Sequence, residues 1–153
     1  MLNILKRKTP QFFSAEQQQQ IVAAIQKAEK TTSGEIRLYV ESHCSYVDAI
    51  DRAEEIFSKL NMYATRQRNA VLLYVALKDK QLALYGDSGI YNHAGKAYWD
   101  SGVKTMIAHF NRDSYAEGIV QVITEIGQTL SQAFPYSEGT DKNELPDDIV
   151  YGK

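Results

Sequence analysis

The sequence predicts an α/β protein: a three-layer α/β/α sandwich around a small mixed β-sheet. Three observations lead to this fold class. Helical and strand patterns follow one another in the order α-β-α-β-β-α-α. Residues 70–77 (AVLLYVAL) are apolar throughout, which suits a central strand that is buried on both faces. The 153 residues, 44% of them hydrophobic, are enough for one domain with a single core.

The first helix is predicted to begin at Ser14. The sequence SAEQ that starts there matches a capping box, and Phe13 can pack against the first turn as a hydrophobic staple. Apolar residues within 21–28 then share one helical face, and residues 31–34 (TTSG) end the helix. Residues 35–41 (EIRLYVE) alternate between apolar and polar side chains, which predicts a β-strand.

The middle of the chain predicts a helix, a polar connection and a β-hairpin. Apolar residues recur at helical spacing over residues 47–60, and residues 61–69 are polar. The apolar strand is followed by a tight turn at residues 78–80 and by a third strand over residues 81–85. Residues 86–92 are expected to form the loop that leads into the next helix.

Two more helices are predicted after this loop. The first spans residues 94–110, and the second starts with a further capping box, SYAE, at Ser114. Gly118 and Gly127 interrupt the second helix, which usually indicates close helix packing.

We expect one domain over residues 10–136 and an acidic, polar C-terminal tail over residues 137–153, without internal repeats. The tail is expected to be extended. It contains three apolar residues that can dock it onto the domain, namely Leu145, Ile149 and Tyr151.

Composition excludes several classes of function. The formal net charge is -2, so no overall basic field favours a nucleic acid as partner. No apolar run reaches the roughly 20 residues of a membrane-spanning helix. Cys44 is the only cysteine, which rules out an internal disulfide and suits a reducing compartment. We therefore expect a soluble, cytoplasmic protein.

The predicted topology gathers oxygen ligands at one edge of the sheet. The first two strands should be parallel and joined by a right-handed crossover, and the third should be antiparallel to both. The end of the third strand then lies beside the starts of the other two, which brings together Glu35, Asn69 and Asp87, with Arg68 beside them. Asp100 can be added from the following helix. Such oxygen donors suit Ca²⁺, with Mg²⁺ as the alternative, and Arg68 is a candidate phosphate or anion contact.

Each of these residues also has a plain structural interpretation. Asp87 can cap a helix or pair with Arg68, and Asn69 can be a turn residue. Glu35 can be exposed or pair with Arg37, and Asp100 can be an exposed helix residue. A nucleotide-binding loop is not predicted at GDSG (residues 86–89), because the lysine of a Walker motif and the pattern GxGxxG are both absent.

The chain resembles the TPM domain family, which is named for a thylakoid lumen protein, a photosystem II-associated protein and a nematode receptor subunit. The segments that carry the resemblance are SGEIRLYVE, RNAVLLYVALKDKQLALYGDSGIY, YWD and NELPDDI, in this order. It is most similar to the short bacterial branch with the NELPD tail. The resemblance implies a Rossmann-like α/β/α sandwich and calcium binding. Many family sequences carry Gly-Tyr-Gly-Leu-Glu where this chain has GDSGI (residues 86–90), so the acidic residue here is Asp87.

Three hypotheses about function follow. The first is a domain that binds a divalent cation, with calcium expected, through Glu35, Asn69, Asp87 and Asp100. The second is a metal-assisted hydrolase similar to an acid phosphatase, which the resemblance to a plant member implies and in which Arg68 would help to hold the phosphoryl group. The third is a protein-interaction module whose acidic tail binds a partner.

Overall fold

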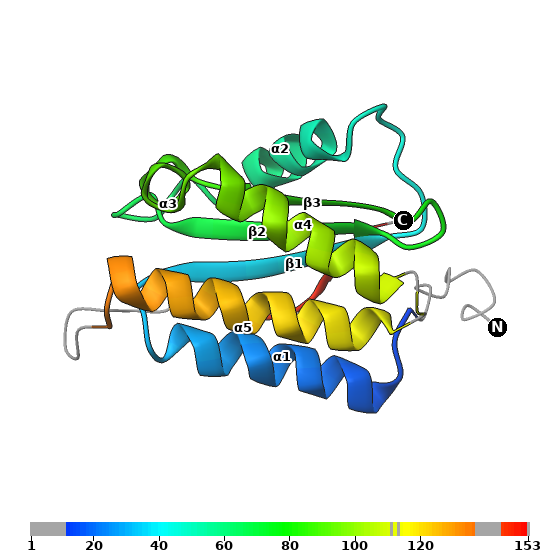
Figure 1. Cartoon of the computed structure of the whole chain (residues 1–153), viewed down its shortest axis with the longest axis horizontal. Coiled ribbons are helices and arrows are strands. Elements are labelled where there is room, and N and C mark those ends of the chain that lie inside the picture. Colours follow the sequence, from blue (N-terminus) through cyan, green and yellow to red (C-terminus); the bar gives the residue numbers. More distant parts are fainter. Residues whose placement is uncertain (1–11, 111, 113, 137–144, 153) are drawn as a thin grey trace, which may run out of the picture.

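The computed structural model describes residues 12–110, 112, 114–136 and 145–152 (Figure 1). The predicted start of the domain at residue 10 and tail residues 137–144 lie outside this part of the chain. The elements, in chain order, are α1 (Ala15–Glu29), β1 (Glu35–Glu41), α2 (Ala49–Lys59), β2 (Ala70–Ala76), β3 (Gln81–Gly86), α3 (Ser88–Ala94), α4 (Lys96–Phe110), α5 (Tyr115–Ala133) and β4 (Val150–Tyr151).

The predicted three-layer sandwich is confirmed. Helices α1, α4 and α5 cover one face of the sheet, and α2 covers the other (Figure 1). The strand order is β3-β2-β1-β4. Strand β1 is parallel to β2, and β3 is antiparallel to β2, as the crossover and the hairpin predict.

Alternation along the strands divides the core into two clusters. Ile36, Leu38 and Val40 of β1 face the cluster that contains α1 and α5, whereas Leu72 and Tyr74 of β2 face the cluster beneath α2. Every residue of β2 is buried, as its apolar run predicts. Burial of one such large aliphatic side chain contributes about 1.5–3 kcal/mol, so β2 anchors both layers.

The first capping box is confirmed and the second is not. The Ser14 Oγ accepts a hydrogen bond from the Gln17 backbone N–H at 3.1 Å, and the Gln17 side chain accepts one from the Ser14 N–H at 3.0 Å. Ser114 precedes α5 without capping it, because its Oγ donates to the carbonyl oxygen of His109 at 3.1 Å. This contact ties the start of α5 to the end of α4 instead.

The predicted loop at residues 86–92 is largely helical. Asp87 caps α3, a helix that the sequence patterns did not separate from the one after it. The break between α3 and α4 lies at Gly95, whose φ of 82° is in the left-handed region that favours glycine.

The described part of the C-terminal tail packs against the domain. Val150 and Tyr151 form β4, parallel to β1, and the Gly152 N–H donates to the carbonyl oxygen of Val40 at 2.7 Å. Leu145 is buried in the cluster beneath α2. The tail therefore contacts both faces of the sheet around the edge of β1, since Tyr151 packs on the opposite cluster.

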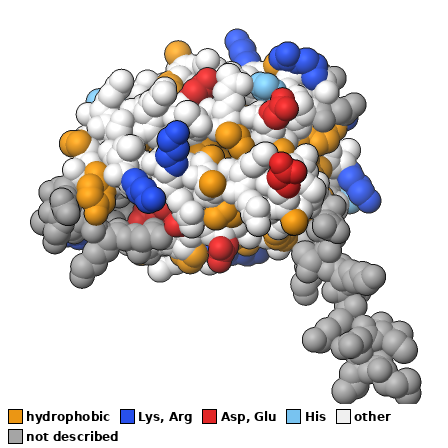
Figure 2. Space-filling model, turned by 90° about the horizontal axis from the view of Figure 1, so that it is seen from below, with side chains coloured by type: hydrophobic (Ala, Val, Ile, Leu, Met, Phe, Trp, Pro, Cys, Tyr) orange, Lys and Arg blue, Asp and Glu red, His pale blue; other side chains and the backbone are white. Residues whose placement is uncertain are grey.

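The outer face of α1 and α5 carries an open groove of about 810 Å³. Figure 2 shows this face with hydrophobic side chains gathered near its centre. Small residues form its floor, among them Ala24, Ala28, Val120 and Gly127. None of the helices in the described ranges has both the length and the apolar character needed to cross a bilayer.

Candidate metal centre

The structure brings the predicted ends of β1, β2 and β3 together at one edge of the sheet. Glu35 is opposite Ala70 in the β1–β2 register, and its N–H donates to the carbonyl oxygen of Asn69 at 3.4 Å. The Asp87 N–H donates to the carbonyl oxygen of Ala70 at 3.0 Å. The structure thus brings Glu35, Asn69 and Asp87 to one edge, while Asp100 is an exposed residue of α4.

Asp87 is engaged by a neighbouring cation and by the helix that it caps. Its carboxylate is 2% exposed and accepts hydrogen bonds from Arg68 Nε at 2.6 Å and Arg68 Nη2 at 2.8 Å. The Ser88 N–H donates to the same carboxylate at 2.7 Å. In return, the Asp87 carboxylate raises the pKa of the Arg68 guanidinium. Asp87 therefore has both of the structural roles that the sequence left open.

Asn69 immediately precedes β2 and lies beside the start of β1. Its side chain is buried, and its Nδ2 donates to Ser33 Oγ at 3.2 Å. Its Oδ1 is buried and has no hydrogen-bond partner within the described residues. A buried carbonyl oxygen of this kind is costly to leave without a donor or a cation.

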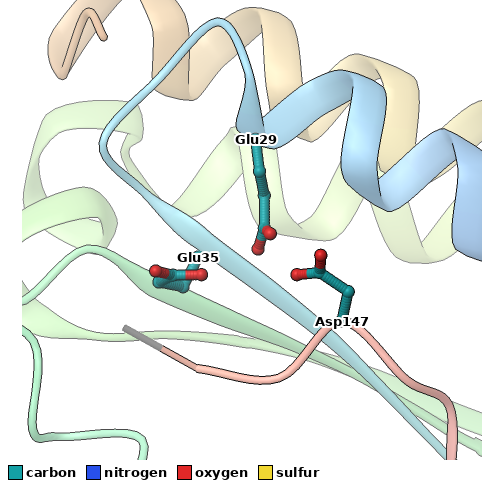
Figure 3. Close-up of side chains that lie close together, drawn as sticks. All are labelled: Glu29, Glu35 and Asp147. Atoms are coloured by element: carbon teal, nitrogen blue, oxygen red, sulfur yellow. The ribbon is translucent and has the colours of Figure 1, made fainter. Parts of the chain in front are cut away.

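Glu35 belongs to a second group, together with Glu29 and Asp147 (Figure 3). One carboxylate oxygen from each of the three lies within 4.8 Å of the others. Glu29 comes from the last turn of α1, Glu35 from the start of β1, and Asp147 from the docked tail. The carboxyl groups of Glu29 and Asp147 point toward one another in Figure 3. We refer to these three residues as the carboxylate cluster.

Glu29 links the end of α1 to the edge of β1. Its Oε2 accepts a hydrogen bond from the Ile36 N–H at 2.8 Å. Its Oε1 is buried and accepts no hydrogen bond in the described part of the chain. The first oxygen is therefore used to hold the edge of the sheet, and the second is available to a ligand.

The carboxylate cluster places three acidic side chains close together. Burial raises the pKa of Glu29 well above its ordinary value of 4.5, and the neighbouring carboxyl groups of Asp147 and Glu35 raise it further. Arg37 is a nearby cation, and burial lowers its pKa while the surrounding carboxylates, including Asp148, oppose that shift. Like charges this close need a shared proton or a cation.

The donor set of the carboxylate cluster fits a hard divalent cation. Calcium takes six to eight oxygen ligands, and carboxylates can bind it with one or both oxygens. The buried Oε1 of Glu29, which has no hydrogen-bond partner among the described residues, and the close approach of three acidic groups are the two features that a cation would satisfy. Glu29 and Glu35 would hold it from the body of the domain, and Asp147 from the tail.

Sequence reasoning reached Glu35 and missed Glu29 and Asp147. Glu29 lies on a helix, whereas the predicted site was assembled mainly from residues at the ends of strands. Asp147 lies within NELPDDI, and only the path of the tail along β1 places it at the edge. The sequence signal for Asp147 was the combination of several acidic residues and apolar docking residues in the C-terminal tail.

Comparisons with known proteins connect this fold to relatives. A family model described as the TPM domain matches residues 7–129. The NMR structure of the BA42 protein from the psychrophilic bacterium Bizionia argentinensis is similar, with 39% sequence identity and a TM-score of 0.85. That alignment covers 95% of this chain and 99% of BA42. Among curated proteins there is no match.

Two more distant NMR structures share the fold alone. One is the N-terminal domain of cg2496 from Corynebacterium glutamicum, with 15% identity, 86% of this chain and 90% of that chain covered, and a TM-score of 0.64. The other is the N-terminal domain of a protein from P. gingivalis, with 12% identity, coverage of 84% and 83%, and a TM-score of 0.63. The fold therefore persists at very low sequence identity.

Proposed function

Because this chain belongs to the TPM domain family, we propose that it is a small cation-binding domain that holds calcium at its carboxylate cluster. The observation that carries the proposal is the convergence of Glu29, Glu35 and Asp147 from three separate segments. Of the four ligands that the sequence predicts, Glu35 is retained. Asp87 is left out because Arg68 neutralises its carboxylate, and Asp100 because it is exposed on α4.

Electrostatic repulsion within the carboxylate cluster supports this proposal. Two unit charges about 4 Å apart repel by about 1 kcal/mol in water and by about 4 kcal/mol at the effective dielectric of a protein surface. Three ionised carboxylates would make three such pairs, and the proton that Glu29 holds without a cation removes two of them. Arg37 supplies a compensating charge nearby. A bound divalent cation replaces repulsion with attraction and satisfies the buried Oε1 of Glu29.

The arrangement favours calcium over magnesium. Magnesium requires near-ideal octahedral geometry and retains several waters, whereas calcium accepts irregular sets of oxygen ligands. The ligands here come from a helix end, a strand start and a tail, which makes a regular octahedron difficult to build. We therefore expect calcium to bind more tightly than magnesium.

Calorimetric titration of calcium into chelator-treated protein tests the proposal. We expect saturable binding with about one calcium per chain, and release of protons on binding at neutral pH because Glu29 must lose its proton. Glu35→Gln and Asp147→Asn should each weaken binding by about tenfold or more, since each removes one charged ligand. Asp51→Asn, an exposed carboxylate on α2, is the matched control and should bind as the wild type does.

Two further variants distinguish the carboxylate cluster from the ligands predicted by sequence. Asp87→Asn and Asp100→Asn should leave the calcium affinity unchanged. If they abolish binding while Glu35→Gln and Asp147→Asn do not, the cation is held at the Arg68 side of the edge and the present assignment is wrong. Absence of calcium binding to the folded wild-type protein would reject the function itself.

A further inference from the structure

A second pocket lies at the same end of the sheet, separate from the carboxylate cluster. Its volume is about 420 Å³, which is within the range of small-molecule sites. It opens between α2, the connection before β2, the end of β3 and the start of α3. No member of the carboxylate cluster lines it. The side chains used below are those of Ile50, Tyr63, Arg68, Tyr85 and Tyr91.

The backbone of Arg68 is fixed in an unusual conformation. Its φ of 53° lies in the left-handed region, which a residue with a side chain seldom occupies. Its N–H donates to the carbonyl oxygen of Thr65 at 3.3 Å, and its carbonyl oxygen accepts from the Gly89 N–H at 2.9 Å. A Cβ at position 89 would lie 2.4 Å from the carbonyl oxygen of Gln67, so only glycine allows this approach. Strained residues of this kind are often found at binding sites.

The Arg68 guanidinium is held in place, but not all of its N–H donors are engaged in hydrogen bonds to the described residues. Asp87 takes two of its five N–H donors, and the guanidinium carbon lies 5.2 Å from the centre of the Tyr63 ring. Among the residues described, Asp87 is the only acceptor of its hydrogen bonds. The side chain is nevertheless 48% exposed. Arg68 is thus a pre-oriented donor with capacity for one more acceptor.

The aromatic walls of the pocket are also held in place. Tyr63 and Tyr85 share a hydrogen bond of 3.1 Å between their hydroxyls, and each ring meets Phe57 edge-on. Tyr91 stacks on Trp99 with 6° between the ring planes, yet is 41% exposed. Rigid aromatic surface that remains exposed is well suited to bind a flat ring at little entropic cost.

We propose that this pocket binds an aromatic carboxylate. The ring would lie against the tyrosines and Ile50, and the carboxylate would accept hydrogen bonds from the remaining N–H groups of Arg68. A ligand with a single negative charge suits this site better than a polyanion, because Asp87 already balances the charge of Arg68 and only the remaining N–H donors are available. The fork of the guanidinium fits a carboxylate closely.

NMR titration of the full-length protein with 2-naphthoate tests this site. Saturable chemical-shift changes are expected in the amides of Arg68, Asp87 and Tyr91. Acetate supplies the charge without the ring, and 2-naphthalenemethanol supplies the ring without the charge. Each should bind at least about tenfold more weakly, because each lacks one of the two interactions.

Variants at the aromatic wall and at the cation complete the test. Tyr91→Ala should weaken 2-naphthoate binding by about threefold to tenfold, the range expected for loss of one aromatic contact. Tyr136→Ala removes a similarly exposed tyrosine that does not line the pocket, and should have no effect. Arg68→Lys keeps the charge but loses the fork, and should reduce the preference for 2-naphthoate over 2-naphthalenemethanol.

The proposal fails if the shift changes map to the groove between α1 and α5, or if Tyr91→Ala binds 2-naphthoate as tightly as the wild type does. Equal affinity for 2-naphthoate and 2-naphthalenemethanol would also overturn it, because the cation would then play no part. Calcium need not be present in these titrations. The result of these titrations is therefore independent of whether the protein binds calcium.

Discussion

Glu29 joins two functions in a single side chain. One carboxylate oxygen accepts the Ile36 N–H at the edge of β1, and the other belongs to the carboxylate cluster. A proton keeps the first interaction intact and relieves repulsion in the cluster. A cation would do the same without the proton, so calcium binding at this residue would connect pH, calcium and the stability of the sheet.

The pKa of Glu29 predicts how stability depends on pH in the presence of a chelator. Its folded-state pKa is raised above the ordinary value of 4.5, so its contribution to stability is full below that value. As pH rises above 4.5, the unfolded chain releases the proton while the folded chain retains it, and the free energy of unfolding falls. Urea unfolding between pH 5 and 8 should therefore show decreasing stability.

Glu29→Gln is the variant that isolates this effect. It cannot ionise, and its unfolding free energy should vary less with pH over the same interval. A wild-type protein whose stability rises from pH 5 to pH 8 in chelator would contradict the prediction. Calcium should reduce the decrease, because it replaces the proton.

Gly89 is the point where α3 meets the turn before β2. A Cβ there would lie 2.4 Å from the carbonyl oxygen of Gln67 and 2.7 Å from that of Arg68, the residue that pairs with Asp87. Gly89→Ala should lower the free energy of unfolding by about 1–3 kcal/mol, as overpacking usually does. Ser88→Ala, at the exposed neighbouring position, should stay within about 0.5 kcal/mol of the wild type in the same urea titration.

At the scale of elements, the docked tail depends on a few contacts. Leu145 is buried beneath α2, and Tyr151 stacks on Phe12 at 5.9 Å and donates to Gln18 Oε1 at 3.1 Å. Strand β4 itself is only two residues long, so these side chains supply much of what holds it. The tail is thus attached at both of its described ends.

Leu145→Ala should lower the free energy of unfolding by about 2–3 kcal/mol, the usual cost of truncating a buried leucine. Pro146→Ala changes the exposed neighbour and is expected to cost less than about 0.5 kcal/mol. Chemical denaturation followed by tryptophan fluorescence measures both, since Trp99 is buried in the core. Equal values for the two variants would mean that the tail does not depend on Leu145.

Particular elements explain how much of this fold could be read from the sequence. The apolar run of β2 and the capping box at Ser14 are local signals, and both are confirmed. The break at Gly95 was missed because the apolar spacing continues across it. Strand β4 was missed because two residues carry no periodicity, and its pairing with β1 is a tertiary contact.

The candidate site also has a part that the sequence predicts and a part that it does not. The directions of the strands predict that Glu35, Asn69 and Asp87 lie at one edge of the sheet, and the structure places them there. Which carboxylates share a ligand depends on side-chain direction and on the path of the tail, which strand order does not determine. Their role as metal ligands is still a prediction.

For the whole molecule, a cation at the carboxylate cluster would link the tail to the domain. Asp147 belongs to the tail, whereas Glu29 and Glu35 belong to the domain. Binding only to the docked state stabilises that state by mass action, by about 2.7 kcal/mol at a calcium concentration one hundred times the Kd. Calcium should therefore suppress opening of the tail.

Hydrogen exchange measures this opening directly. The Gly152 amide, bonded to the Val40 carbonyl oxygen, should exchange more slowly when calcium is added. In Asp147→Asn the slowing should be much smaller, whereas the Ala70–Ala76 strand should be protected in both proteins. Calcium-independent exchange at Gly152 in the wild type would show that the tail and the cation are not coupled.

The pairing of β4 with β1 also means that the described sheet is completed only after the last of its strands has been synthesised. Strand β1 leaves the ribosome well before residues 150–151, which are the partner of its outer edge within the described ranges. At about 5–20 residues per second, this interval lasts on the order of ten seconds. During that time the nascent chain exposes an open strand edge, at which a chaperone or a second nascent chain can pair. Stalled translation upstream of residue 150 should therefore leave a chain that is prone to aggregate.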